Sequence, residues 1–107
     1  MADRKVLRIL RYLERCLGES GLNVSKMILF GSHARGEAPP DSDIDVAIIS
    51  EDFRGRGIFE RSDLIGDAHE RVVEKFVVPL DIVTMTPEEL ERGTSLVAQF
   101  VSQGRPI

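Results

Sequence analysis

Three aspartates interrupt apolar segments of this sequence, and carboxylates in such positions are suited to binding a cation. Asp43 and Asp45 lead into the apolar residues 46–49, and Asp81 stands within the stretch 78–83. Side chains two residues apart on a strand share a face, so Asp43 and Asp45 project together. Adjacent like charges destabilise a fold unless they are neutralised. Mg²⁺ neutralises them with carboxylate oxygens as ligands and retains coordination sites for phosphate oxygens.

Each acid taken singly also has a structural explanation. Asp43 could cap a turn together with Asp41 and Ser42, and Asp81 could pair with an arginine at the edge of a sheet. For any one acid this explanation is at least as good as metal binding. The case for chemistry therefore depends on other residues of the sequence.

The pair Gly31-Ser32 precedes the acids and indicates where a phosphate would bind. Glycine allows a backbone to approach a ligand closely. If Ser32 opens a helical turn, its hydroxyl and the free amides form a cradle for an anion. Arg35 follows, and it could contact phosphate or hold the acidic loop through Glu37 or Asp41. We include Arg35 among the candidate nucleotide-binding residues.

The spacing of these residues is more specific than any one of them. Gly31-Ser32, then ten residues, then Asp43-x-Asp45 is a chance match in roughly one chain in a thousand at average residue usage. We therefore predict that these four residues form one site, with Asp81 as its third acid.

Apolar periodicity and capping signals predict the elements that must position the site. We expect helices at 3–19, 60–76 and 96–102, a helix start at 86–89, and strands at 24–30, 44–50 and 77–85. Pro79 indicates an edge strand or a strand start. The alternation of helices and strands along the chain predicts an α/β (α+β) fold with a small mixed sheet flanked by helices.

Composition excludes several classes of protein. We expect 107 residues to form a single domain over 1–107, and the net charge of −4 counts against direct nucleic-acid binding. No apolar run is long enough for a membrane helix or a signal peptide. The lone Cys16 excludes an internal disulfide, argues against a thiolate zinc site and fits a cytoplasmic location.

The sequence resembles the nucleotidyltransferase domain of the DNA polymerase beta superfamily. The resemblance is carried by Leu-Phe-Gly-Ser-His-Ala-Arg-Gly at 29–36 and by Ser-Asp-Ile-Asp at 42–45. Size and spacing are similar to those of the minimal nucleotidyltransferases (MNT) of prokaryotes. The likeness extends from residue 24 through Asp81 to the closing residues 103–107. His33 occupies a variable position of the motif, so we expect a surface role for it.

The resemblance implies a reaction and a role for each site residue. Asp43 and Asp45 would hold two Mg²⁺ ions on the triphosphate of ATP, and Asp81 would complete the metal site and help activate the attacking hydroxyl. Gly31 and Ser32 would position the β and γ phosphates. In-line attack on the α-phosphate would release pyrophosphate, a reaction that needs mainly positioning and charge neutralisation.

The resemblance also implies a partner protein. Larger members of the superfamily bind the base and the acceptor with additional domains, for which we expect no room here. The usual partner of an MNT protein is a helical HEPN protein. In many such pairs, which act as toxin and antitoxin, the MNT protein transfers AMP to a tyrosine of a HEPN ribonuclease.

Two other functions remain open at this stage. The chain could transfer a nucleotide to the hydroxyl of a small molecule with the help of a helical partner, or it could be an antitoxin that acts by binding alone. Nucleotide preference is also open, because base recognition has no short motif here. Homo-oligomer formation is open as well, because the apolar positions of the first and last helices could close a core or form a dimer.

Overall fold

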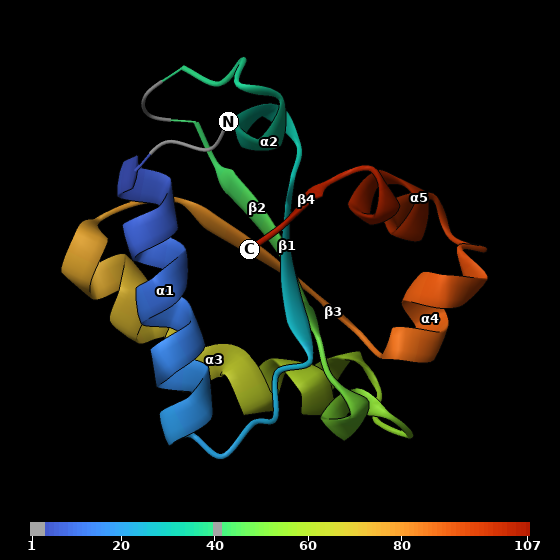
Figure 1. Ribbon diagram of the computed structural model, residues 1–107. Coiled ribbons are helices and arrows are strands. Elements are labelled where there is room, and N and C mark those ends of the chain that lie inside the picture. Colours follow the sequence, from blue (N-terminus) through green and yellow to red (C-terminus); the bar gives the residue numbers. More distant parts are fainter. Residues whose placement is uncertain (1–3, 40–41) are drawn as a thin grey trace.

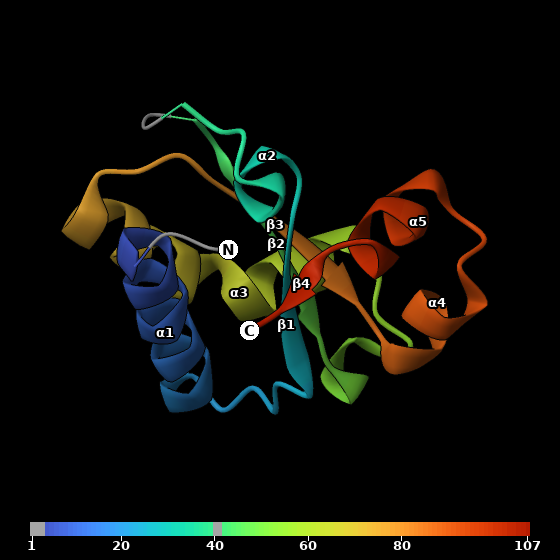
Figure 2. The same ribbon diagram turned by 45° about the horizontal axis from the view of Figure 1, so that its top comes forward.

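The computed structural model describes residues 4–39 and 42–107 and shows a central sheet with helices on both faces (Figures 1 and 2). In chain order the elements are α1 (Arg4–Glu19), β1 (Lys26–Phe30), α2 (Ser32–Arg35), β2 (Ile44–Ile49), the 3₁₀ turn η1 (Glu51–Phe53), α3 (Ile58–Phe76), β3 (Leu80–Met85), α4 (Pro87–Arg92), α5 (Leu96–Ser102) and β4 (Arg105–Pro106).

The strands form one mixed sheet in the order β3-β2-β1-β4. β1 is antiparallel to both β2 and β4, and β2 is parallel to β3. The predicted fold is therefore confirmed. β4 was not predicted, because Gly104 and Pro106 read only as the end of a helix and the strand consists of two residues that pair with β1. β3 begins directly after Pro79 and lies at a sheet edge, as that proline indicated.

One face of the sheet packs against α1 and α3 (Figure 1). The apolar stripe of α1 is buried as its periodicity predicted. In β2 the residues Ile44, Val46 and Ile48 point to this face and are buried with it. α3 contributes Ile65, Ala68 and Val72 to this core, whereas its Val73 is 38% exposed. None of the helices in the described part of the chain is long and apolar enough to cross a membrane.

The opposite face of the sheet carries a second, smaller core. Ala47 and Ile49 of β2 pack there with Ala98 and Val101 of α5. Because strand side chains alternate, Asp45 points to this same face. The strand that builds the second core therefore also presents a carboxylate, at its N-terminal end.

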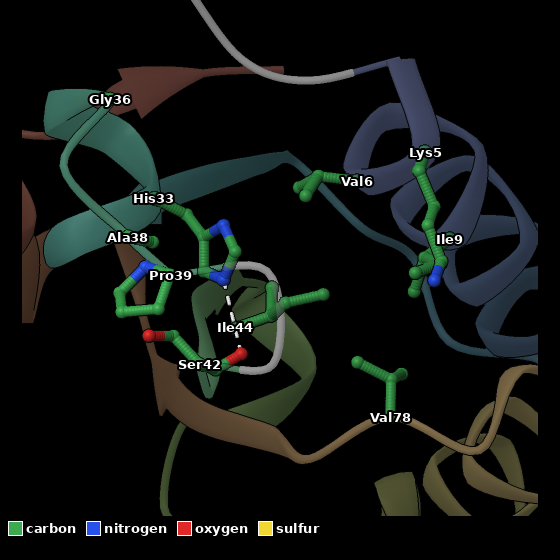
Figure 3. A pocket seen from close by; sticks show the side chains of 10 residues that line it. All are labelled: Lys5, Val6, Ile9, His33, Gly36, Ala38, Pro39, Ser42, Ile44 and Val78. Atoms are coloured by element: carbon green, nitrogen blue, oxygen red, sulfur yellow. Dashed lines mark hydrogen bonds between the residues drawn. The ribbon is translucent and has the colours of Figure 1, made fainter.

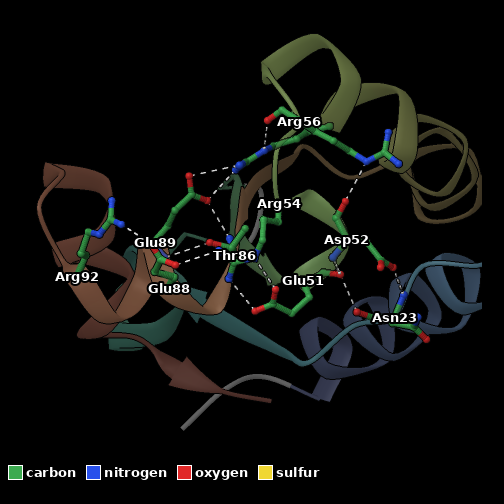
Figure 4. Close-up of polar contacts among 11 residues, drawn as sticks. Asn23, Glu51, Asp52, Arg54, Arg56, Thr86, Glu88, Glu89 and Arg92 are labelled. Atoms are coloured by element: carbon green, nitrogen blue, oxygen red, sulfur yellow. Dashed lines mark hydrogen bonds and ion pairs between the residues drawn. The ribbon is translucent and has the colours of Figure 1, made fainter.

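Charged pairs hold the elements together at the C-terminal ends of β2 and β3 (Figure 4). Arg54 follows η1 and bridges Glu51 at 2.8 Å and Glu88 of α4 at 2.9 Å. α4 begins with the predicted capping box, in which Thr86 Oγ1 accepts from the Glu89 amide and Glu89 Oε1 accepts from the Thr86 amide. These contacts join the loop after β2 to the helix after β3.

Candidate active site

The pairing register of β2 and β3 brings two of the predicted acids side by side. Asp45 and Asp81 are direct partners in the parallel ladder, so their Cα atoms lie about 4.8 Å apart and their side chains share a face. Asp43 precedes β2 by one residue and is exposed, as is Asp81, whereas Asp45 is half-buried. The structure thus gathers the three acids at one end of the sheet.

The carboxyl group of Asp45 is in an unfavourable electrostatic environment. Burial raises the pKa of Asp45, and the negative charges of Asp81 and Asp43 raise it further, while His33 acts in the opposite direction. Among the described residues, no lysine or arginine forms an ion pair with any of these acids. An arginine partner for Asp81 is therefore not observed in this part of the chain, and Asp41, the suggested turn partner of Asp43, lies outside it.

Gly31 lies directly against Asp45, and no other residue type fits there. Its backbone has φ 75° and ψ −157°, a region that is essentially restricted to glycine. A Cβ at this position would overlap Oδ2 of Asp45 and lie 3.2 Å from its Cγ. The absent side chain therefore brings the start of α2 into contact with the acidic site.

Ser32 opens α2, as the phosphate-cradle hypothesis required. The first amides of a helix have no acceptors within the helix, so those of α2 are available to an anion. Arg35 is exposed, and its Nε lies 3.2 Å from Oε1 of Glu37. Of the two roles considered for Arg35, the structure therefore shows the contact with the loop.

Two side chains that were not predicted hold α2 in place. His33 is half-buried rather than at the surface, and its Nε2 donates to the Ser42 carbonyl oxygen at 3.1 Å (Figure 3). Arg105 Nε donates to the Ala34 carbonyl oxygen at 2.7 Å. Nothing in the local sequence signals the Arg105 contact, because its partner lies 71 residues away.

The donor set of the site fits a magnesium ion that also binds phosphate. Among the described residues, no three histidine, cysteine or acidic side chains converge closely enough to enclose a metal ion. Mg²⁺ usually binds proteins through one or two carboxylates and completes its coordination with water and substrate phosphates. Burial and the charges of Asp81 and Asp43 raise the pKa of Asp45, and a bound cation would favour its ionised form.

A family model agrees with this geometry. The model of the nucleotidyltransferase domain matches residues 9–107, which is nearly the whole chain. The chain belongs to the nucleotidyltransferase family. The resemblance inferred from the Gly-Ser and Asp-x-Asp residues is thereby confirmed, and the match includes the segments that carry the site of this nucleotidyltransferase.

Individual relatives are consistent with the family. A provisionally named protein adenylyltransferase of Methanocaldococcus jannaschii is 28% identical over 90 residues. These residues cover 82% of the nucleotidyltransferase chain and 60% of the relative, so the chain spans less than two thirds of that protein. A solved structure of a provisionally assigned minimal nucleotidyltransferase is 28% identical, with TM-score 0.53 and coverage of 100% and 95% of the two chains.

A toxin–antitoxin structure solved with AMP-PNP also contains a similar chain. The TM-score is 0.63 at 21% identity, and the match covers 90% of this nucleotidyltransferase and 69% of the other chain. At this level of identity the similarity establishes the shared fold alone.

Proposed function

We propose that this domain transfers AMP from ATP to a hydroxyl acceptor in a Mg²⁺-dependent reaction, and that the acceptor is a tyrosine of a HEPN-type helical toxin. The observation that carries the proposal is the meeting of Asp45, Asp81 and Gly31 at one end of the sheet, in a member of the nucleotidyltransferase family. None of these acids forms an ion pair with a described lysine or arginine, which supports a role in binding a ligand.

Each residue of the site has a separate role in the proposed reaction. Asp43, Asp45 and Asp81 would hold the magnesium ions, which when bound supply positive charge to the attacking and leaving oxygens. Gly31 and Ser32 would hold the β and γ phosphates, so that the α-phosphorus faces the acceptor. Arg35 would add a guanidinium to the phosphates on release from Glu37, as such groups bind phosphate oxygens well.

The transfer step is an in-line displacement at the α-phosphorus. The acceptor oxygen forms a bond to phosphorus while the bond to the bridging oxygen of the β-phosphate breaks, and pyrophosphate leaves with that electron pair. The carboxylate of Asp81 takes the proton of the attacking hydroxyl. The products are an AMP ester of the acceptor and pyrophosphate.

Two comparisons support a protein acceptor. The relative from Methanocaldococcus jannaschii is provisionally named a protein adenylyltransferase, and a toxin–antitoxin structure with AMP-PNP shares the fold. The thiol of Cys16 is free and buried, which supports a site of action in the reducing cytoplasm. We infer that the described chain forms the catalytic domain and that the toxin supplies the acceptor surface.

The decisive experiment follows AMP from α-labelled ATP. The purified chain is incubated with a candidate HEPN-type helical protein, labelled ATP and MgCl₂, and both proteins are analysed by mass spectrometry. We expect one AMP on a tyrosine of the helical protein and none after its replacement by phenylalanine. An Asp43→Asn, Asp45→Asn double variant should give no label, whereas Asp67→Asn, which changes an exposed acid of α3, should label as the unmodified chain does.

Other outcomes would identify the alternatives. A tight complex without label would contradict transfer and indicate an antitoxin that acts by binding. AMP on a small-molecule hydroxyl, with none on the helical protein, would contradict the protein acceptor and retain the nucleotidyltransferase.

A further inference from the structure

A cavity of about 310 Å³ borders the candidate site between β1, α2 and α5. Its lining includes Phe30, Gly31, Arg35, Phe100 and Gln103. We call it the α5 cavity. Its volume is in the range of small-molecule sites, and it shares Gly31 and Arg35 with the predicted phosphate-binding residues.

The cavity drawn in Figure 3 has a different position. It measures about 280 Å³ and lies beside α1, with Val6, Ile9 and Ile44 in its lining. Its lining includes neither Gly31 nor Arg35. Of these two cavities, the α5 cavity is therefore the one that a ligand anchored at Gly31 would enter.

The chemistry of the α5 cavity suits a nucleobase better than a phosphate. Phe30 and Phe100 supply aromatic surface, and Phe100 is 54% exposed although phenylalanine is usually buried. Bases stack on such rings. The amide of Gln103 offers a donor and an acceptor side by side, as the amino group and ring nitrogen of adenine require.

The C-terminal segment fixes the α5 cavity relative to the phosphate-binding turn. Gly104 crosses β1 so closely that a Cβ there would lie 2.5 Å from the Leu29 carbonyl oxygen and 2.7 Å from Cγ2 of Ile28. The next residue, Arg105, donates to the carbonyl oxygen of Ala34 in α2. The end of α5 and the start of α2 are thus tied to the same strand, β1.

We propose that the α5 cavity is the nucleobase subsite of this nucleotidyltransferase. The purine ring of ATP stacks on Phe100 and directs its polar edge to Gln103, while the triphosphate lies across Gly31 and Ser32. Phe100 is the principal determinant of affinity for the base. This inference rests on the proposed function, because it takes a nucleoside triphosphate as the donor.

The test separates binding of the base from binding of the phosphates. Isothermal titration calorimetry in MgCl₂ measures the affinity of the chain for ATP and for inorganic tripolyphosphate, which has no base. We expect Phe100→Ala to weaken ATP about tenfold, the order of one lost stacking contact, and to leave tripolyphosphate unchanged. Phe100→Tyr keeps the ring and should retain the affinity for ATP.

Two further variants sharpen the test. Leu96→Ala removes another exposed apolar side chain of α5 that does not line the cavity, and it should change neither affinity. Gln103→Ala should weaken ATP about two- to tenfold, as loss of one hydrogen bond does. Thermal unfolding of every variant shows that it is folded at the temperature of the titration.

Each result has a distinct meaning. If ATP binds the unmodified chain and Phe100→Ala equally well, or if ATP binds no more tightly than tripolyphosphate, the nucleobase subsite is elsewhere and the inference is wrong. If neither ATP nor tripolyphosphate binds the unmodified chain, the proposed function itself is contradicted.

Discussion

Acidic side chains gather at both ends of the parallel pair β2 and β3, and the two groups differ in ion pairing and in the direction of their pKa shifts. At the N-terminal end, Asp45 and Asp81 are neighbours in the ladder. No described lysine or arginine pairs with either of them, and burial together with the neighbouring acids raises the pKa of Asp45.

At the C-terminal end, Glu51, Glu88 and Glu89 each pair with an arginine (Figure 4). Hydrogen bonds from Arg54 lower the pKa of Glu51 and of Glu88, and those from Arg61 lower the pKa of Glu89. These pairs join η1, α3 and α4.

The difference distinguishes acids that stabilise the fold from acids suited to binding a ligand. Ion-paired carboxylates add modestly to stability and have little capacity left for a cation. Unpaired carboxylates held together cost stability in the free protein, and perturbed clusters of this kind are typical of functional sites. We expect substitutions at the two ends to separate stability from activity.

The largest expected effect is on activity. Asp45→Asn should lower nucleotidyl transfer at least about 100-fold, because it removes charge that the reaction needs at the phosphates. Glu88→Gln, at the other end of the sheet, should leave the rate of transfer within about twofold, since exposed ion pairs contribute little. Initial rates of AMP transfer measure both, and comparable losses in the two variants would abolish the distinction.

The next effect concerns the contact that shapes the acidic end. Gly31→Ala should cost about 1–3 kcal/mol of unfolding free energy from its backbone conformation, with more from overlap with Asp45. Gly36→Ala is the control, because Gly36 also has positive φ, 71°, but open space for a Cβ. Urea denaturation should show the larger loss of unfolding free energy for Gly31→Ala. Equal losses would show that the Asp45 side chain moves away from the added Cβ without a cost in stability.

A smaller loss of stability is expected at the paired end. Glu89 completes the capping box of α4 and lies 2.8 Å from Nη1 of Arg61, whose side chain is only 14% exposed. Glu89→Ala should therefore lower the unfolding free energy by about 1–2 kcal/mol, the sum of a lost cap and a lost ion pair. Glu91→Ala, which changes an exposed acid of the same helix, is the control and should be neutral within about 0.5 kcal/mol. Urea denaturation of the two variants measures this difference.

The smallest effect has the opposite sign and depends on pH. Because the folded pKa of Asp45 is raised, its protonated form favours the fold, and that contribution is lost as pH rises through the folded pKa. At neutral pH without metal, Asp45→Asn should raise the melting temperature by about 1–4 °C, since relief of like-charge contacts is worth a few tenths of a kcal/mol.

The higher melting temperature of Asp45→Asn should disappear at acidic pH. As pH falls below the folded pKa of Asp45, the carboxyl group becomes neutral in the unmodified chain, and the two melting temperatures should converge. Calorimetry from neutral pH to about pH 3 follows the difference, which should be closed there because most Asp45 is then protonated even in the unfolded chain, where its pKa is about 3.9. A constant difference at all pH values would assign the effect to packing rather than to charge.

Much of the fold could be predicted because its signals are local. The buried stripe of α1 follows from apolar residues at helical spacing, and the capping box of α4 from Thr86 and Glu89 three residues apart. β4 could not be predicted in this way. Its two residues have no pattern of their own, and they become a strand only because β1 offers an edge.

The candidate site also has features that the local sequence predicts and features that it does not. The sequence by itself determined which side chains could do chemistry, since Gly31, Ser32, Asp43 and Asp45 lie within 15 residues of one another at a characteristic spacing. Together with the flanking residues at 29–36 and 42–45, that spacing carried the resemblance to the family.

Only the tertiary structure decided how these residues meet. The β2–β3 register places Asp81 beside Asp45, and the close approach of Gly31 to Asp45 follows from the β1–β2 pairing. Phe100 reaches the same region from the far end of the chain. Contacts of this kind depend on the packing of elements distant in sequence, and no local pattern of residue types encodes them.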